Sequence, residues 1–287
     1  MSYATVVSTY YQLKKLLDEA AVQEKRRNDN NPDDGKGKFK ISPISFISGI
    51  AAGLADTAGN YPVYGLHYRK QRGINIWQWK YFTPRELYRG VIPYSAIIPV
   101  TCIMDGMTDF LKGNGVAPAF ASFISGGIAA ILISTPTTNL IVTDQRLSEA
   151  GEPAGLRNSI KEIVKYNGYA GFRTGMQWLI VREGIYSWSV FYAKDATKKH
   201  LQCNDGVASI ISGTFATIIS HPFDTLSTYM QGQKIRKYSV ICIKEMLKER
   251  GLARFYNGFF FRCWAVIAGI YVMDKVSHYV KTSFTSV

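Results

Sequence analysis

SHPFDTLSTYMQGQ, residues 220–233, places a proline and a single acid inside a largely apolar run. Asp224 follows Pro222 by two residues, and Gln231 follows it by nine. A proline within a helix removes one backbone hydrogen bond and kinks the helix. Positions two, five and nine after it share one face, because offsets of three and seven return to the same side of a helix. The stretch therefore predicts a kinked helix that turns one carboxylate toward a neighbouring element.

The same spacing occurs three times along the chain. Each copy has a proline, predicted to kink its helix, with a glycine nine residues before it and a glutamine nine residues after it. In the first and third copies another small residue, Gly49 or Ser209, precedes the glycine by four, which predicts a close helix–helix contact. Each copy continues into an aromatic–glycine motif and a second apolar segment, so the repeat unit is a helix pair. The prolines are Pro62, Pro136 and Pro222, the glycines are Gly53, Gly127 and Gly213, and the glutamines are Gln71, Gln145 and Gln231.

Apolar segments alternate with basic loops over the 287 residues. Isolated charges interrupt most of these segments, among them Asp56, Asp224 and Arg262. Charges inside a membrane are costly and almost always face an interior cavity or pathway. Loops 67–90 and 231–257 each carry a net charge of +5, and positive loops on one side are typical of multi-pass membrane proteins. We therefore predict an all-α membrane protein whose six transmembrane helices lie near 43–66, 91–111, 114–142, 177–193, 207–230 and 258–280.

The sequence lacks the motifs of common enzyme classes. It contains no GxGxxG, Walker A, HExxH or GxSxG sequence. Its four cysteines are far apart and have no histidine at metal-ligand spacing. Its positive charge is spread over several loops, whereas nucleic-acid binders concentrate it on one face or arm. We therefore expect no enzyme activity, no metal or other cofactor, and no nucleic-acid partner.

These features resemble the mitochondrial carrier family over roughly residues 40–285. The proline motifs, PVYGLHYRKQ, PTTNLIVTDQ and PFDTLSTYMQ, match the family's odd-helix motif, in which an acid and a base follow the proline. The resemblance implies a pseudo-threefold bundle of six tilted helices around a central cavity, in the mitochondrial inner membrane. It divides the chain into an N-terminal extension, 1–40, and three carrier repeats, 41–113, 114–200 and 201–287.

The resemblance also implies a gate at each end of the cavity. On the matrix side, the acid of one repeat pairs with the base of another, and here only Asp224 with His67 retains such a pair. An alternative is that Asp224 bonds to hydroxyls such as those of Thr225 and Ser227. On the cytoplasmic side, two acid–base motifs and a third lysine match the family pattern. The predicted matrix-side gate is His67, Asp224, Gln71, Gln145 and Gln231, and the predicted cytoplasmic-side gate is Asp109, Lys112, Asp195, Lys198 and Lys281.

Substrate contacts are expected in the middle of the cavity. The resemblance assigns them to Arg182 and Glu183, where the acid would meet an ammonium group and the arginine a carboxylate. Arg262, one turn before the matching position on the sixth helix, either joins them or extends toward the membrane interface. The matching positions in the other repeats, 96–97 and 265–266, carry no charge. Cardiolipin is expected at turns before the even helices, at Tyr88, Arg89, Gly90, Gly175 and Gly258.

Two functions are open on the sequence alone. The depleted matrix-side ring favours an accessory or structural subunit of a large inner-membrane assembly, such as a respiratory complex, with impaired transport. The extension 1–40, an amphipathic helical pattern and a polar linker, would supply the protein contact. The alternative is an active, divergent carrier that exchanges a small zwitterionic metabolite, an amino acid or a carnitine-like compound. The three glutamines and the cytoplasmic-side pairs support that alternative.

Overall fold

The computed structural model describes residues 43–98 and 100–285, with some side chains in these ranges left out. The predicted extension, 1–40, and the side chain of Lys281 therefore lie outside the described residues. Within the described ranges the chain is helical and contains no strand. The all-α prediction is therefore confirmed.

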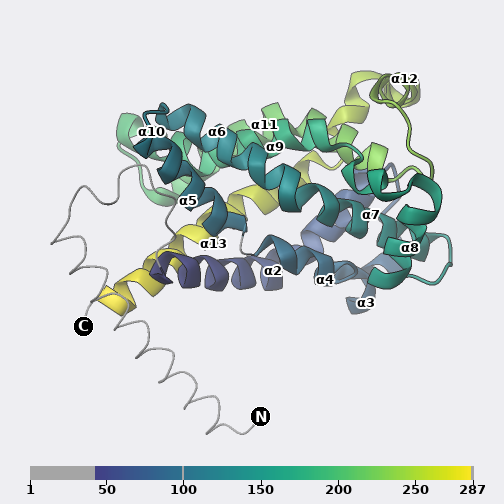
Figure 1. Ribbon diagram of the computed structural model, residues 1–287, viewed down its shortest axis with the longest axis horizontal. Helices are drawn as coiled ribbons and strands as arrows, with labels where there is room; N and C mark the ends of the chain where they lie inside the picture. Colours follow the sequence, from purple (N-terminus) through teal and green to yellow (C-terminus); the bar gives the residue numbers. More distant parts are fainter. Residues whose placement is uncertain (1–42, 99, 286–287) are drawn as a thin grey trace, which may run out of the picture.

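Helical segments paired as the repeat predicts follow the long axis of the molecule (Figure 1). In the second repeat, two shorter helices are each joined to the next by a π-helical turn, at Ala130–Ser134 and Ser189–Ala193. The long segments are α2 (Pro43–Gln71), α5 (Val100–Gly113), α6 (Pro118–Ala129) with α7 (Thr135–Glu149), α9 (Met176–Trp188) with α10 (Lys194–Leu201), α11 (Asp205–Gln231) and α13 (Phe259–Thr285). The short helices are α3 (Pro84–Leu87), α4 (Val91–Tyr94), α8 (Leu156–Asn167) and α12 (Ser239–Arg250).

The long helices form a closed ring in chain order. Helix α2 packs on α5, α5 on α6, α6 on α9, α9 on α11, α11 on α13, and α13 along α2. The short helices α3, α8 and α12 lie toward one end of the molecule (Figure 1). This is the bundle of three helix pairs that the repeat predicts.

The outer surface of the bundle is apolar. Several large hydrophobic side chains are more than half exposed, among them Phe120, Leu132, Phe215 and Trp264. By length and composition, three helical stretches of the described chain could cross a membrane, 118–149, 205–231 and 239–272. Helices α2 and α9 carry buried charges, such as Asp56 and Arg182, and these lower the hydropathy of both helices.

The π-helical turn Ala130–Ser134 shifts the register of the second repeat. A π-helical turn inserts one extra residue into an α-helix. Gly53, nine residues before its proline, packs against Ile98 of its own repeat, where a Cβ atom would lie 2.8 Å from the isoleucine side chain. In the second repeat the equivalent close contact is made by Gly126, ten residues before Pro136. The nine-residue spacing between glycine and proline therefore selects Gly127, whereas the close contact is made by Gly126, one residue earlier.

Candidate functional site

Asp224 lies at the centre of a buried polar cluster and is 1% exposed. His67 Nε2 lies 2.9 Å from its Oδ2 atom, and Gln71 donates to the same oxygen at 2.5 Å. Arg262 Nη1 lies 2.8 Å from Oδ2, and Arg182 Nη1 donates to Oδ1 at 2.9 Å. These donors come from α2, α9 and α13, whereas Asp224 belongs to α11. One carboxylate therefore joins all three repeats.

The charges in this cluster explain why so many donors gather there. A buried carboxylate is stable only when it is hydrogen-bonded and paired with positive charge. Arg182 also forms a close ion pair with Glu183, its neighbour in the chain. In the described part of the cluster, two carboxylates thus face two guanidinium groups, and removal of one group would leave a buried charge unpaired.

The three glutamines each connect one repeat to another. Gln71 of the first repeat donates to Asp224 of the third. Gln231 of the third donates to the Thr138 hydroxyl of the second at 3.1 Å, and Gln145 of the second donates to a backbone carbonyl of α2 at 3.2 Å. These contacts run around the bundle in one direction and close it at the Asp224 end.

A second ion-pair network lies beside the first, nearer the short helices. Arg72, the residue after α2, pairs with Glu149 of α7 through two hydrogen bonds of 2.7 Å each. Arg69 contacts Glu86 at 2.8 Å and Glu149 at 3.4 Å. Burial alone would raise the pKa of Glu86, but hydrogen bonds and charge from Arg89 outweigh it and hold that pKa below its usual value.

Sequence reasoning missed this second network. The family motif places its acid and base two and five residues after each proline, and after Pro136 these two positions hold no charged residue. The available signal was a pair of arginines flanking Gln71 and an acid, Glu149, four residues after Gln145. Residues four apart lie on the same helix face, so Glu149 shares the face of Gln145.

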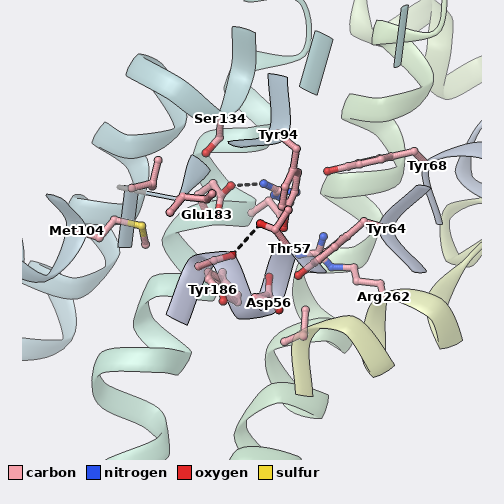
Figure 2. A pocket seen from close by; sticks show the side chains of 15 residues that line it. Asp56, Thr57, Tyr64, Tyr68, Tyr94, Met104, Ser134, Glu183, Tyr186 and Arg262 are labelled. Carbon is pink, nitrogen blue, oxygen red and sulfur yellow. Dashed lines mark hydrogen bonds and ion pairs between the residues drawn. The ribbon is translucent and has the colours of Figure 1, made fainter. Parts of the chain in front are cut away.

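A cavity of about 90 Å³ opens beside the Asp224 cluster. Arg182, Glu183 and Arg262, the predicted substrate contacts, all line it, together with several tyrosines and Asp56 (Figure 2). Arg262 is 4% exposed and pairs with Asp224, so it faces the interior rather than the membrane interface. The cavity and the closed end of the bundle therefore share two arginines.

A family model described as mitochondrial carrier protein matches residues 115–205 and 203–286, more than half of the chain. This chain belongs to the mitochondrial carrier family. The two matched segments correspond to the second and third predicted repeats. Membership of this carrier family points to the mitochondrial inner membrane and to transport rather than catalysis.

Known mitochondrial carriers are similar to this chain at low identity. The probable mitochondrial 2-oxodicarboxylate carrier of Dictyostelium discoideum is 23% identical over 80% of this chain and 88% of its own length. An uncharacterized mitochondrial carrier of Schizosaccharomyces pombe is 26% identical over 78% of this chain and 87% of its own length. Tricarboxylate transport protein B, mitochondrial, of Danio rerio is 25% identical over 61% of this chain and 62% of its own length.

The predicted cytoplasmic-side residues of this carrier make local, exposed contacts. Asp109 and Lys112 lie 3.5 Å apart within α5, and Lys198 Nζ lies 2.6 Å from Asp205 at the start of α11. Asp195 is exposed, and Lys281 lies outside the described side chains. The described ion pairs at the Asp224 end are therefore buried, whereas those at the predicted cytoplasmic side are exposed.

The predicted lipid-binding turns are packed against the next repeat. Gly175, with φ of 74°, approaches Ser227 so closely that a Cβ atom would lie 3.1–3.2 Å from its backbone. Gly258 meets His67 and Gly90 meets Ile141 in the same manner. Their left-handed backbone and close contacts explain the glycines without a ligand. Cardiolipin binding at these turns stays a prediction.

Arg89 and Tyr88, of the same predicted lipid site, also have protein partners. The guanidinium of Arg89 donates to Glu86 and lies 3.8 Å from Asp144. The Tyr88 hydroxyl donates to the Ala58 carbonyl, although the side chain is 41% exposed. A lipid phosphate would therefore compete with Glu86 for Arg89.

Glu149→Gln tests the second ion-pair network. Arg72 would lose both charge-assisted hydrogen bonds and Arg69 one charged neighbour, in a site where the Glu149 side chain is 12% exposed. We expect the free energy of unfolding to fall by about 2 kcal/mol. The thermal unfolding midpoint in detergent measures this loss. Glu152→Gln, in the exposed loop after α7, removes the same charge and serves as the control. Equal midpoints for the two variants would contradict a stabilising role for the Arg72–Glu149 pair.

Proposed function

We propose that this chain is an active, divergent mitochondrial carrier that exchanges a small zwitterionic metabolite, such as an amino acid or a carnitine-like compound. The observation that carries the proposal is the double role of two arginines. Arg182 and Arg262 line the cavity and also hold Asp224, which joins the repeats at the closed end. Substrate binding and gate opening therefore depend on the same guanidinium groups.

The shared arginines suggest how substrate binding would open the gate. A substrate carboxylate in the cavity competes with Asp224 for Arg182 and Arg262. Once the arginines turn to the substrate, Asp224 retains only His67 and Gln71, and the contact between repeats weakens. A ligand shifts a two-state equilibrium only through its different affinity for the two states. Competition for shared arginines supplies that difference, and alternating access follows.

The accessory-subunit interpretation depended on how few ion pairs the sequence seemed to retain between repeats. The Asp224 cluster and the Arg72–Glu149 pair raise that number, which supports transport. The named relatives are transporters as well. The extension 1–40, expected to contact a host complex, lies outside the described residues and adds no support.

Exchange in liposomes tests the proposal. The full chain would be reconstituted into vesicles loaded with L-carnitine, L-ornithine, 2-oxoglutarate or citrate, and uptake of each labelled compound measured. We expect exchange of at least one of L-carnitine and L-ornithine, each of which carries both an ammonium and a carboxylate group. Exchange of the two carboxylic acids alone, or of none of the four, would contradict it. A non-denaturing gel of gently extracted membranes tests the accessory role, since comigration with a large respiratory complex would favour that role.

A further inference from the structure

Asp56 is a buried carboxylate that faces the cavity and has no counter-ion among the described residues. It lies on α2, is 6% exposed, and accepts a hydrogen bond of 2.8 Å from Asn60. Among the described residues, no lysine, arginine or histidine lies within ion-pair distance of it. A buried carboxylate in this position is costly unless positive charge reaches it. A positively charged group of a ligand would supply that charge.

The charged residues around the cavity indicate the charge of the ligand group that would bind beside Asp56. Asp224 and Glu183 face Arg182 and Arg262, so these four groups balance one another. Asp56 adds a further carboxylate, and no described cation pairs with it. A positive group of a ligand in the cavity would supply the pairing charge.

Tyrosine side chains surround the space in front of Asp56. Tyr64, Tyr94 and Tyr186 line the same cavity and come from three different segments of the chain (Figure 2). The rings of Tyr64 and Tyr94 lie 5.5 Å apart at an angle of 37°. Aromatic faces attract cations, and aromatic cages with an acid are the usual site for alkylammonium groups. A volume of about 90 Å³ suits a compact head group, because pockets for drug-sized ligands measure roughly 300–1,000 Å³.

We propose that Asp56, Tyr64, Tyr94 and Tyr186 form a site for the alkylammonium group of the transported metabolite. The inference rests on the proposed function and assigns the cationic half of its substrate. The carboxylate half meets Arg182 and Arg262 across the same cavity. A substrate with both groups neutralises Asp56 while it competes with Asp224 for the arginines.

Binding to the purified full chain tests the site directly. Isothermal titration would compare L-carnitine, a quaternary ammonium, with L-ornithine, whose ammonium groups are primary, and with 2-oxoglutarate, which has none. We expect Asp56→Asn to weaken binding of the ammonium probes at least tenfold and to leave any 2-oxoglutarate binding unchanged. Glu152→Gln, which removes an exposed acid, should bind as the wild type does. Unchanged ammonium binding by Asp56→Asn, or binding of neither ammonium probe to the wild type, would overturn the proposal.

Two substitutions of Tyr186 keep the test open if Asp56→Asn does not fold. Tyr186→Phe retains the aromatic face, and we expect ammonium affinity within about threefold of the wild type. Tyr186→Leu removes that face, and we expect affinity to fall about tenfold. Equal affinities of the leucine and phenylalanine variants would count against the cage.

Liposome exchange separates this proposal from the proposed function. Ammonium binding that depends on Asp56, without exchange of any compound, would retain the site and reject transport. Exchange that Asp56→Asn leaves unchanged would retain transport and reject the site. A preference for carnitine over ornithine, or the reverse, distinguishes a quaternary from a primary ammonium ligand, and both support the alkylammonium site.

Discussion

Asp224→Asn is expected to abolish exchange in liposomes and to lower the thermal unfolding midpoint by several degrees. Asparagine has the same shape as aspartate but cannot neutralise the two guanidinium groups that lie 2.8–2.9 Å from the carboxylate. Removing one partner from a buried ion pair costs about 3–5 kcal/mol, because the remaining charge is left unpaired. Uptake of labelled substrate and thermal unfolding in the same detergent measure the two effects.

A charge-balanced double variant separates stability from transport. Asp224→Asn combined with Arg262→Gln removes one charge of each sign, so we expect part of the lost stability to return. Exchange should remain absent, since the shared arginine and its gate partner are both missing. Glu152→Gln, exposed and remote from the cluster, is the control for loss of one acid. Retention of both exchange and the wild-type midpoint by Asp224→Asn would contradict the central role given to this carboxylate.

Gly126→Ala is expected to destabilise the second repeat strongly. A Cβ atom at this position would overlap the backbone carbonyl of Glu183 and lie 2.7 Å from the side chain of Ser187. The obstacle is backbone, so α6 and α9 must move apart. Overpacking of this kind costs about 1–3 kcal/mol and occasionally more. Because Glu183 and Arg182 belong to α9, exchange should fall together with the unfolding midpoint.

Gly127→Ala is the matched control for this prediction. Its Cβ atom would meet only the side chain of Ile180, at 3.3 Å, which can shift by a few tenths of an ångström. Alanine also favours a helix over glycine by roughly 0.8–1 kcal/mol. We therefore expect the Gly127 variant to unfold near the wild-type temperature. A Gly127 variant as unstable as the Gly126 variant would place the close contact in the register that the sequence suggests.

The fold could be predicted from the sequence because its signals are local. Pro62 and Pro222 lie inside long helices, and Pro136 follows a π-helical turn. The glycine and glutamine spacings then identify one long helix in each repeat, and the aromatic–glycine motif that follows identifies the start of the next. Hydropathy alone could not do this, because cavity-lining charges such as Asp56 and Arg262 reduce the apolar signal of helices that lie in the bundle.

The site was less predictable because its contacts cross between repeats. Arg182 and Arg262 are 42 and 38 residues from Asp224 in the sequence, and only the closed ring of helices brings them together. That no described cation reaches Asp56 is a property of the assembled cavity and has no signature in the sequence. A two-residue motif such as Arg182-Glu183 could be found, because its members are adjacent and carry opposite charge.

The π-helical turns could not be predicted from the proline and glutamine spacing. Ser189–Ala193 lies between the Arg182-Glu183 pair and the charged end of the same segment, and it adds one residue there. Counting back from that end therefore places the matching positions of the other repeats one residue too early in the chain. The corrected positions are 97–98 and 266–267.

The corrected register makes Ile98 the counterpart of Glu183, and Val266 the counterpart of Arg182, and both line the cavity. At these matched positions the second repeat presents two charged side chains, whereas Ile98 of the first repeat and Val266 of the third present aliphatic ones. A substrate with a methylated or branched hydrocarbon part would make dispersion contacts with these aliphatic side chains while other residues bind its polar ends. A strongly hydrated substrate, such as a tricarboxylate, would lose water where it faces these aliphatic side chains, and they offer no hydrogen bonds in return.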